Sequence, residues 1–149
     1  MKKTTATVVA LSVALLVSAA PLIAHHAFSA EFDQSKPLTM TGKFIKMDWV
    51  NPHSWVHFEV TSADGKKQIW EAETPPPNQL TRSGWSKNLL QAGDVIRVTG
   101  SAAKDGSTKM WSGGVTLLEQ GGKKLETPKA VWSFNANPDG PQGGFAPGR

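Results

Sequence analysis

The fold of this chain is decided by the stretch Trp49-Val50-Asn51-Pro52-His53-Ser54-Trp55-Val56-His57-Phe58-Glu59-Val60. Its first half interrupts regular structure, because Pro52 fixes its own φ and biases Asn51 away from helix. In its second half, apolar residues occupy every second position from Val56 to Val60. That period of two predicts a strand with one buried face. The residues between them then lie on the opposite face, beside the loop that carries His53.

A long strand precedes this stretch and changes phase part-way along. Two successive sets of alternate residues share its faces: Leu38, Met40, Gly42 and Phe44, then Ile45, Met47 and Trp49. A change of parity inside a strand is what a β-bulge produces. We therefore predict a bent first strand that pairs with neighbours on two sides of a small barrel.

The second strand leads into a third through a hairpin. Residues 62–66 read as the turn and residues 67–74 as the third strand, with Gly65 in a left-handed conformation. A loop of odd length keeps both glutamates of the third strand out of the core. The predicted register contains the pairs Val60–Trp70, Phe58–Ala72, His57–Glu73 and Glu59–Glu71.

After three consecutive prolines the pattern predicts one short helix and two more strands. Asn78 can cap a helix that ends near Ser83 and turns Leu80 inward. A fourth strand follows at residues 95–100, and Ile96 and Val98 are its candidate core residues. A fifth strand runs over about residues 108–118, with Gly113-Gly114 as a bulge or close approach and one side formed by Trp111, Val115 and Leu117.

Three strands, a helix and two further strands are the order of the OB-fold. The sequence therefore predicts an all-β protein with one short helix, built as a five-stranded OB-like Greek-key barrel over residues 38–120. Residues 25–37 are predicted to form an extended arm. Residues 121–149 are rich in Pro and Gly, and we expect a disordered tail there, because such a segment buries too little apolar surface to offset its ordering entropy. The alternative is that Trp132 and Phe134 dock on the barrel, although we expect Trp132 to contribute little to stability.

Residues 1–24 are predicted to form a secretory signal peptide. Lys2 and Lys3 supply a basic start, the following run is almost wholly apolar, and Ala24 is a small residue at a suitable cleavage position. The competing interpretation is an uncleaved membrane anchor, although the apolar run is shorter than the ~20 residues of a spanning helix. The sequence thus predicts a periplasmic or secreted protein with no stable membrane anchor after cleavage.

Composition limits the possible partners. The chain has no Cys, so it has no disulfides and no residue for lipid attachment at the cleavage site. Its formal charge is +4, of which Lys2 and Lys3 supply two, leaving +2 after cleavage. So mild a charge does not favour nucleic acid. The partner is expected to be a small ligand or a periplasmic protein.

Several short motifs together resemble a known family. They are Ala24-His25-His26-Ala27-Phe28-Ser29-Ala30-Glu31-Phe32-Asp33, Asn51-Pro52-His53, Gly84-Trp85, and Gly93-Asp94 through Thr99-Gly100. The combination is similar to a family of small exported bacterial proteins catalogued as a domain of unknown function. The resemblance spans about residues 24–118. It implies export and an OB-like barrel, and it implies no activity.

All four histidines lie in the first third of the mature chain, which suggests a metal site. Cleavage after Ala24 would make His25 the N-terminus, and its amine and imidazole could chelate one ion together with His26. A nitrogen-rich site of this kind suits Cu(II). His53 and His57 are the candidates to complete it. The alternative for each histidine is structural: a solvated cleavage remnant, a loop hydrogen bond, or a cross-strand pair with Glu73.

The candidate ligand groove lies around the Asn-Pro turn and the start of the second strand. Its predicted residues are Trp49, Asn51, His53, Trp55 and Glu73. No nucleophile elbow, phosphate loop, zinc-protease motif or Cys-His pair occurs in the sequence. We therefore predict a non-enzymatic binding or accessory protein, with a copper-binding protein as the alternative.

Overall fold

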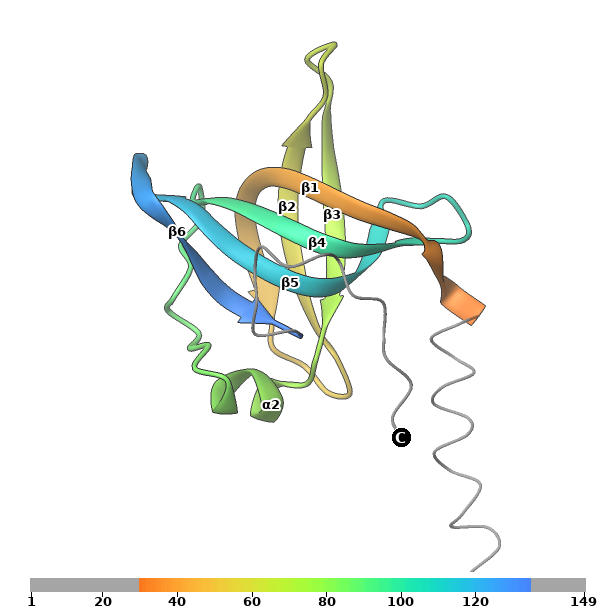
Figure 1. Cartoon of the computed structure of the whole chain (residues 1–149), viewed down its shortest axis with the longest axis horizontal. Helices are drawn as coiled ribbons and strands as arrows, with labels where there is room; N and C mark the ends of the chain where they lie inside the picture. The colour runs from red at the N-terminus through yellow and green to blue at the C-terminus, as the bar shows by residue number, and fades with distance from the viewer. Residues whose placement is uncertain (1–29, 135–149) are drawn as a thin grey trace, which may run out of the picture. The chain divides into compact units, whose positions relative to one another are not determined.

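The computed structural model describes residues 30–134, and Figure 1 shows their arrangement. Every strand and helix named here lies within residues 32–133. The predicted signal peptide, His25, His26 and the last part of the predicted tail lie outside the described residues. The elements are β1 (Phe32–Asp48), β2 (Ser54–Thr61), β3 (Lys67–Thr74), α2 (Pro77–Arg82), β4 (Val95–Ala103), β5 (Lys109–Gln120) and β6 (Lys123–Ser133).

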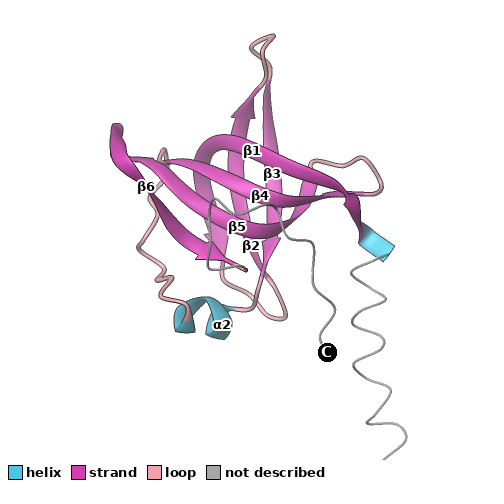
Figure 2. Ribbon diagram, viewed as in Figure 1, coloured by secondary structure: helices cyan, strands magenta, loops and turns pink. Residues whose placement is uncertain are grey.

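The first five strands close into a barrel. The sheet order is β3-β2-β1-β4-β5-β6, and an additional pairing of β3 with β5 closes the ring. Every pairing is antiparallel except β3–β5, which is parallel over residues 71–73 and 109–111. Figure 2 shows that strands dominate the unit. The predicted five-stranded OB-like barrel is confirmed. Within residues 30–134, no helix has the length and apolarity needed to cross a membrane.

Strand β1 bends as its sequence pattern predicts. Its first part, from Phe32 to Lys43, pairs with β4, and its last part, from Lys43 to Asp48, pairs with β2. The register shifts at Ile45, which is the extra residue of a bulge. The strand starts before the predicted boundary at residue 38, because Phe32 pairs with Ala103 and is buried.

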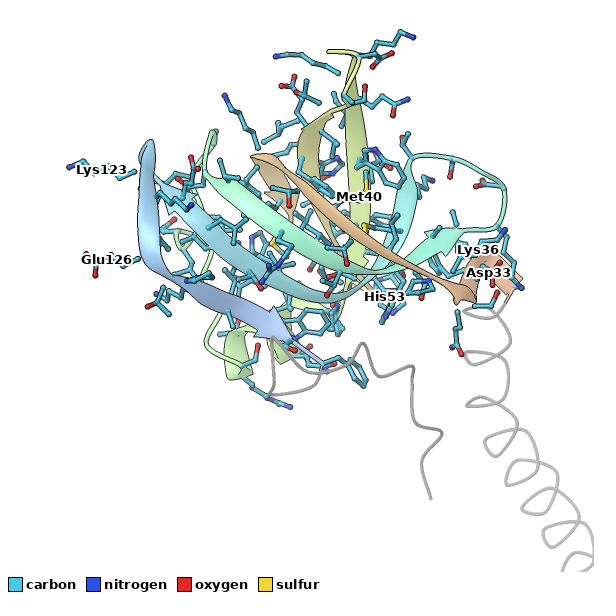
Figure 3. All side chains as sticks on the ribbon, turned by 45° about the horizontal axis from the view of Figure 1, so that its top comes forward. Asp33, Lys36, Met40, His53, Lys123 and Glu126 are labelled. Carbon is cyan, nitrogen blue, oxygen red and sulfur yellow. The ribbon has the colours of Figure 1, made fainter. Side chains whose placement is uncertain are left out.

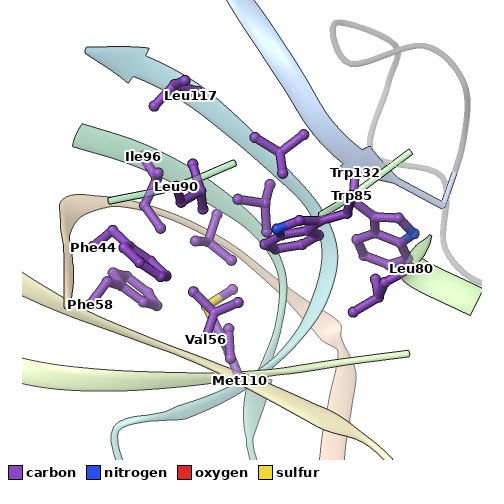
Figure 4. Close-up of a cluster of buried hydrophobic side chains, with 14 residues drawn as sticks. Phe44, Val56, Phe58, Leu80, Trp85, Leu90, Ile96, Met110, Leu117 and Trp132 are labelled. Atoms are coloured by element: carbon purple, nitrogen blue, oxygen red, sulfur yellow. The ribbon is translucent and has the colours of Figure 1, made fainter. Parts of the chain in front are cut away.

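The core fills the barrel and extends beneath β6 (Figure 4). The predicted inward residues Val56, Phe58, Ile96 and Val98 are all fully buried. Leu80 of α2 is also fully buried, as predicted. The helix itself begins with Pro77, and no side chain caps it, so the predicted cap at Asn78 is wrong. Proline suits the first helical position, because its missing N–H would have no intrahelical partner there.

The predicted β2–β3 register is displaced by two residues. The loop has an odd length and Gly65 has φ 81°, both as expected. However, Phe58 pairs with Trp70, and His57 pairs with Glu71 in place of Glu73. The turn covers residues 62–66 as predicted, and in it the Ser62 amide donates to the Lys66 carbonyl. A turn over these residues places Thr61 opposite Lys67, and the predicted pairs did not follow from it. Glu73 therefore moves opposite Trp55.

A bulge in β5 changes which side of the barrel Trp111 faces. The β4–β5 register slips between Thr99 and Gly100, leaving Gly113 as the extra residue. The predicted bulge is thus confirmed, but Trp111 does not share a side with Val115. A Cβ at Gly100 would overlap the Trp111 carbonyl oxygen, so only glycine allows this approach. The slip turns Met110 into the core and Trp111 outward.

The predicted disordered tail contains a sixth strand. Strand β6 pairs with β5 and buries Val131 and Trp132 in the main core. These two apolar residues give the segment buried surface that its Pro and Gly content did not suggest. Leu125 also packs against this core. Most of the other β6 residues are polar, and Figure 3 shows Lys123 and Glu126 pointing away from the barrel. Charges and a Pro are the usual protection of an edge strand against further pairing.

Candidate ligand-binding face

Two parallel rows of side chains cross the outside of the barrel from β1 to β5. The first, the aromatic row, runs through the paired positions Asp48, Trp55, Glu73 and Trp111. The second, the charged row, runs through Lys46, His57, Glu71 and Lys109. Because side chains alternate along a strand, both rows stand on the surface opposite the core. We call these eight residues and His53 the outer face.

Glu73 is the most enclosed carboxylate of the outer face, with only 7% of the residue exposed. Strand pairing places it between Trp55 on one side and Trp111 on the other. Adjacent strands are ~4.8 Å apart, so the two indoles rise from backbones about 10 Å apart, with Glu73 between them. The Nδ1 atom of His53 contacts the Glu73 carboxylate. A buried carboxylate is costly unless it is partnered, and His53 is such a partner.

His53 is held in place by aromatic contacts. It lies in the loop after the cis Asn51-Pro52 bond and is labelled in Figure 3. Its ring meets Trp111 edge-on at 5.8 Å between centroids. Trp111 also contacts Phe32, at the start of β1, with centroids 6.3 Å apart. The beginning of β1 and the β1–β2 loop thus both fix the end of the aromatic row.

In the charged row, His57 lies between two carboxylates. Its Nε2 is 2.8 Å from the Asp48 Oδ2, and its Nδ1 is 3.6 Å from the Glu71 Oε1. The Lys46 ammonium also donates to Asp48, at 2.9 Å. The Lys46 hydrogen bond, with a smaller contribution from His57, holds the pKa of the Asp48 carboxyl below its usual value. Lys46, His57 and Glu71 of the charged row are therefore engaged in contacts within the outer face.

The Lys109 side chain reaches across β3. Its Nζ lies 5.8 Å from the centre of the Trp55 ring, although Lys109 belongs to β5 and Trp55 to β2. That distance is within the range of a cation–π interaction. Lys109 therefore spans the surface above the strand that carries Glu71 and Glu73.

All nine residues of the outer face fall within a region shared with other proteins. A family model described as "Family of unknown function (DUF6152)" matches residues 13–112, which is more than half of the chain. The chain belongs to this family. The predicted membership of an uncharacterised family is thus confirmed. No curated protein matches the chain.

The structure brings together only part of the predicted groove of this DUF6152 protein. His53, Trp55 and Glu73 are adjacent, as predicted. Trp49 instead packs edge-on against Trp85, at 6.1 Å between centroids, and belongs to the core side of the loop. Asn51 is exposed and makes no hydrogen bond or ion pair among the contacts described here.

Five residues of the outer face were not among the predicted site residues, namely Lys46, Asp48, Glu71, Lys109 and Trp111. Barrel closure adds the last two. Both come from β5, which reaches β3 only through the closing parallel pair. For Trp111, the signal in the sequence was the predicted bulge at Gly113-Gly114, because an extra residue there turns the Trp111 side chain to the outer surface. Lys109 carried no distinguishing signal, since its position over Trp55 depends on barrel closure.

The described histidines do not form a metal site together. His53 contacts Glu73, whereas His57 contacts Asp48 and Glu71. Within residues 30–134, no group of three or more His, Asp or Glu side chains is arranged to hold a metal ion. The predicted copper ligands His25 and His26 lie outside these residues, so the N-terminal chelate remains a prediction.

Proposed function

We propose that this DUF6152 protein is an exported, non-enzymatic binding protein that acts in the periplasm or as a secreted protein and holds its ligand on the outer face. The observation that carries the proposal is the enclosed Glu73 between two tryptophans. A strand residue on an outer surface is normally solvated. Enclosing a carboxylate there costs free energy, and a partly buried charge beside convergent aromatic groups is typical of a binding site.

The location supports the same conclusion. OB-fold proteins commonly bind ligands on the face of their second and third strands, bounded by the β1–β2 and β4–β5 loops. Here Trp55 and Glu73 come from those strands, and His53 comes from the first of those loops. Lys109 directly follows the second loop. This is a fold-level analogy, so it supports the place of the site and leaves the ligand to the chemistry of the side chains.

A screen of small fragments tests the proposal. We expect fragments to shift the indole N–H resonances of Trp55 and Trp111 in two-dimensional nitrogen–proton spectra of the labelled protein. Replacing Trp55 by alanine should weaken this binding about two- to tenfold, because an aromatic contact contributes ~0.5–1.5 kcal/mol.

The matched control is Ile69→Ala, which removes an exposed side chain from the same side of β3 but beyond the two rows. It should leave fragment binding unchanged. If no fragment of cationic, anionic or uncharged type shifts either indole signal, the outer face is not a binding surface. Equal losses in both variants would contradict the assignment of Trp55.

Copper binding is the second candidate function, and it is supported by the adjacent His25 and His26 at the predicted cleavage site. An N-terminal amine and an imidazole can chelate Cu(II) together. The amine has a reference pKa of about 7.7–8.0 and must lose its proton to bind. Copper affinity should therefore fall as the pH drops from about 7 to about 5.

A one-residue extension before His25 tests the copper site. The extension moves the amine but keeps every imidazole. Replacing a group that only hydrogen-bonds to a metal ligand lowers metal affinity about 10–100-fold. Because the amine is itself a ligand, we expect its displacement to lower Cu(II) affinity by more than about tenfold. The control is His57→Ala, which should have a smaller effect, because His57 is engaged by Asp48 and Glu71. Equal affinities of the native and extended forms would exclude the N-terminal chelate.

A further inference from the structure

The Lys109 ammonium shows what the aromatic row attracts. A lysine on the outer surface of a barrel is free to extend into water, yet this one lies over Trp55, on the far side of β3. The face of an indole attracts cations through its quadrupole. Trp55 is only half-buried, so part of its surface is open to solvent. The protein's own ammonium group therefore marks a position where a positive charge is favoured.

Negative charge lies below that position. Strand β3, which Lys109 crosses, carries Glu71 directly opposite Lys109 and Glu73 directly opposite Trp55. Each of these two glutamates contacts an imidazole, Glu73 that of His53 and Glu71 that of His57. With histidine counted as neutral, the outer face holds three carboxylates and two ammonium groups. It is thus locally negative in a chain whose formal charge is +4.

From this arrangement we infer that the outer face binds a small organic cation, whose ammonium group lies over Trp55 and displaces the Lys109 side chain. The inference rests on the proposed function and gives its ligand class. Glu73 and Glu71 supply the countercharge, and Trp55 and Trp111 supply apolar surface for the rest of the ligand. Aromatic rings combined with carboxylates are suited to alkylammonium groups.

Other ligand classes fit this surface less well. An anion would meet Glu71 and Glu73 on the same strand, and like charges at short range are unfavourable. An uncharged ligand would have no coulombic attraction to either carboxylate. It would also have to compete with Lys109 for the surface of Trp55. A cation gains from both carboxylates and from the indole face of Trp55. It must still displace Lys109, so Lys109 is expected to lower the affinity of the site.

Three probes of the same shape and different charge provide the test. They are choline, its uncharged carbon isostere neohexyl alcohol, and the anion of tert-butylacetic acid. Each is titrated into the full chain with its native N-terminus at constant ionic strength, and the Trp55 indole resonance is followed after assignment with Trp55→Phe. We expect choline to shift this resonance and the other two probes to shift it at least tenfold less at equal concentration.

The Lys109→Met variant is the decisive arm. Removing the competing ammonium should raise choline affinity about two- to fivefold, which corresponds to the strength of an exposed cation–π contact. The matched control is Lys87→Met, which changes the net charge equally at an exposed site in the segment after α2. It should leave choline affinity unchanged. Glu73→Gln should weaken choline binding about tenfold, through loss of the coulombic attraction between the Glu73 carboxylate and the trimethylammonium group.

The outcomes separate this inference from the proposal on which it rests. Equal binding of choline and neohexyl alcohol overturns the cation assignment but keeps a binding face. If the anion binds best and Lys109→Met weakens that binding, the cation assignment is likewise overturned and the binding face is kept. No response to these probes, with other fragments still shifting the Trp55 signal, also overturns only the cation assignment. Should Glu73→Gln fail to fold by circular dichroism, the Lys109→Met comparison alone decides.

Discussion

Replacing Phe58 by alanine is expected to lower the free energy of unfolding by ~3–5 kcal/mol, the usual cost of truncating a buried phenylalanine. The side chain is fully buried, and its strand neighbours are Phe44 on β1 and Trp70 on β3. A cavity at this position would therefore affect three strands together. Because a domain of this size is typically stable by ~5–15 kcal/mol, the loss is a large part of the total. Urea denaturation followed by circular dichroism measures it.

The control for Phe58→Ala is Ile69→Ala in the same hairpin. Ile69 is 57% exposed, and surface substitutions of this kind usually change stability by less than ~0.5 kcal/mol. If the two variants lose similar amounts of stability, the assignment of the inner and outer faces of β2 and β3 is wrong. The outer face would then also be misplaced, since it is defined by the same alternation.

The parts of the fold that could be predicted are those in which local pattern and barrel topology agree. The alternation of Val56 and Phe58 was sufficient to place β2, because a strand with one buried face carries its own signal. The bend in β1 was visible as a change of parity before Ile45. The β2–β3 register was not fixed by pattern, because a shift of two residues keeps every side chain on the same face. Only the turn geometry decides between such registers.

Two of the nine residues of the outer face are brought to it by closure of the barrel. His53, Trp55 and Glu73 lie on the stretch that the sequence pattern emphasised and on the strand paired with it. Trp111 and Lys109 reach them only because β5 closes on β3. The bulge at Gly113 was predictable from the glycine pair. Its extra residue places Trp111 on the opposite face from Val115, and this consequence was not drawn from the sequence. A bulge moves every later prediction on that strand to the other face.

The largest error of sequence reasoning concerns Trp132, and it leads to the second large stability effect. Composition averages over a segment, and the Pro and Gly content of residues 121–149 outweighed the few apolar residues in β6. The structure buries Trp132 to 5% exposure in the same cluster as Leu80 and Trp85 (Figure 4). Strand β6 is therefore expected to act as part of the barrel's core and not as an appendage.

Trp132→Ala should accordingly lower the free energy of unfolding by ~3–5 kcal/mol, as expected for a buried tryptophan. The matched control is Phe134→Ala, because Phe134 touches the Trp132 ring edge-on but is 49% exposed. It should cost clearly less. A second variant that ends the chain after Gly122 removes all of β6 and should destabilise the barrel at least as much as Trp132→Ala. If Trp132→Ala and Phe134→Ala denature at the same urea concentration as the parent, β6 does not contribute to the core, and the barrel is stable without its sixth strand.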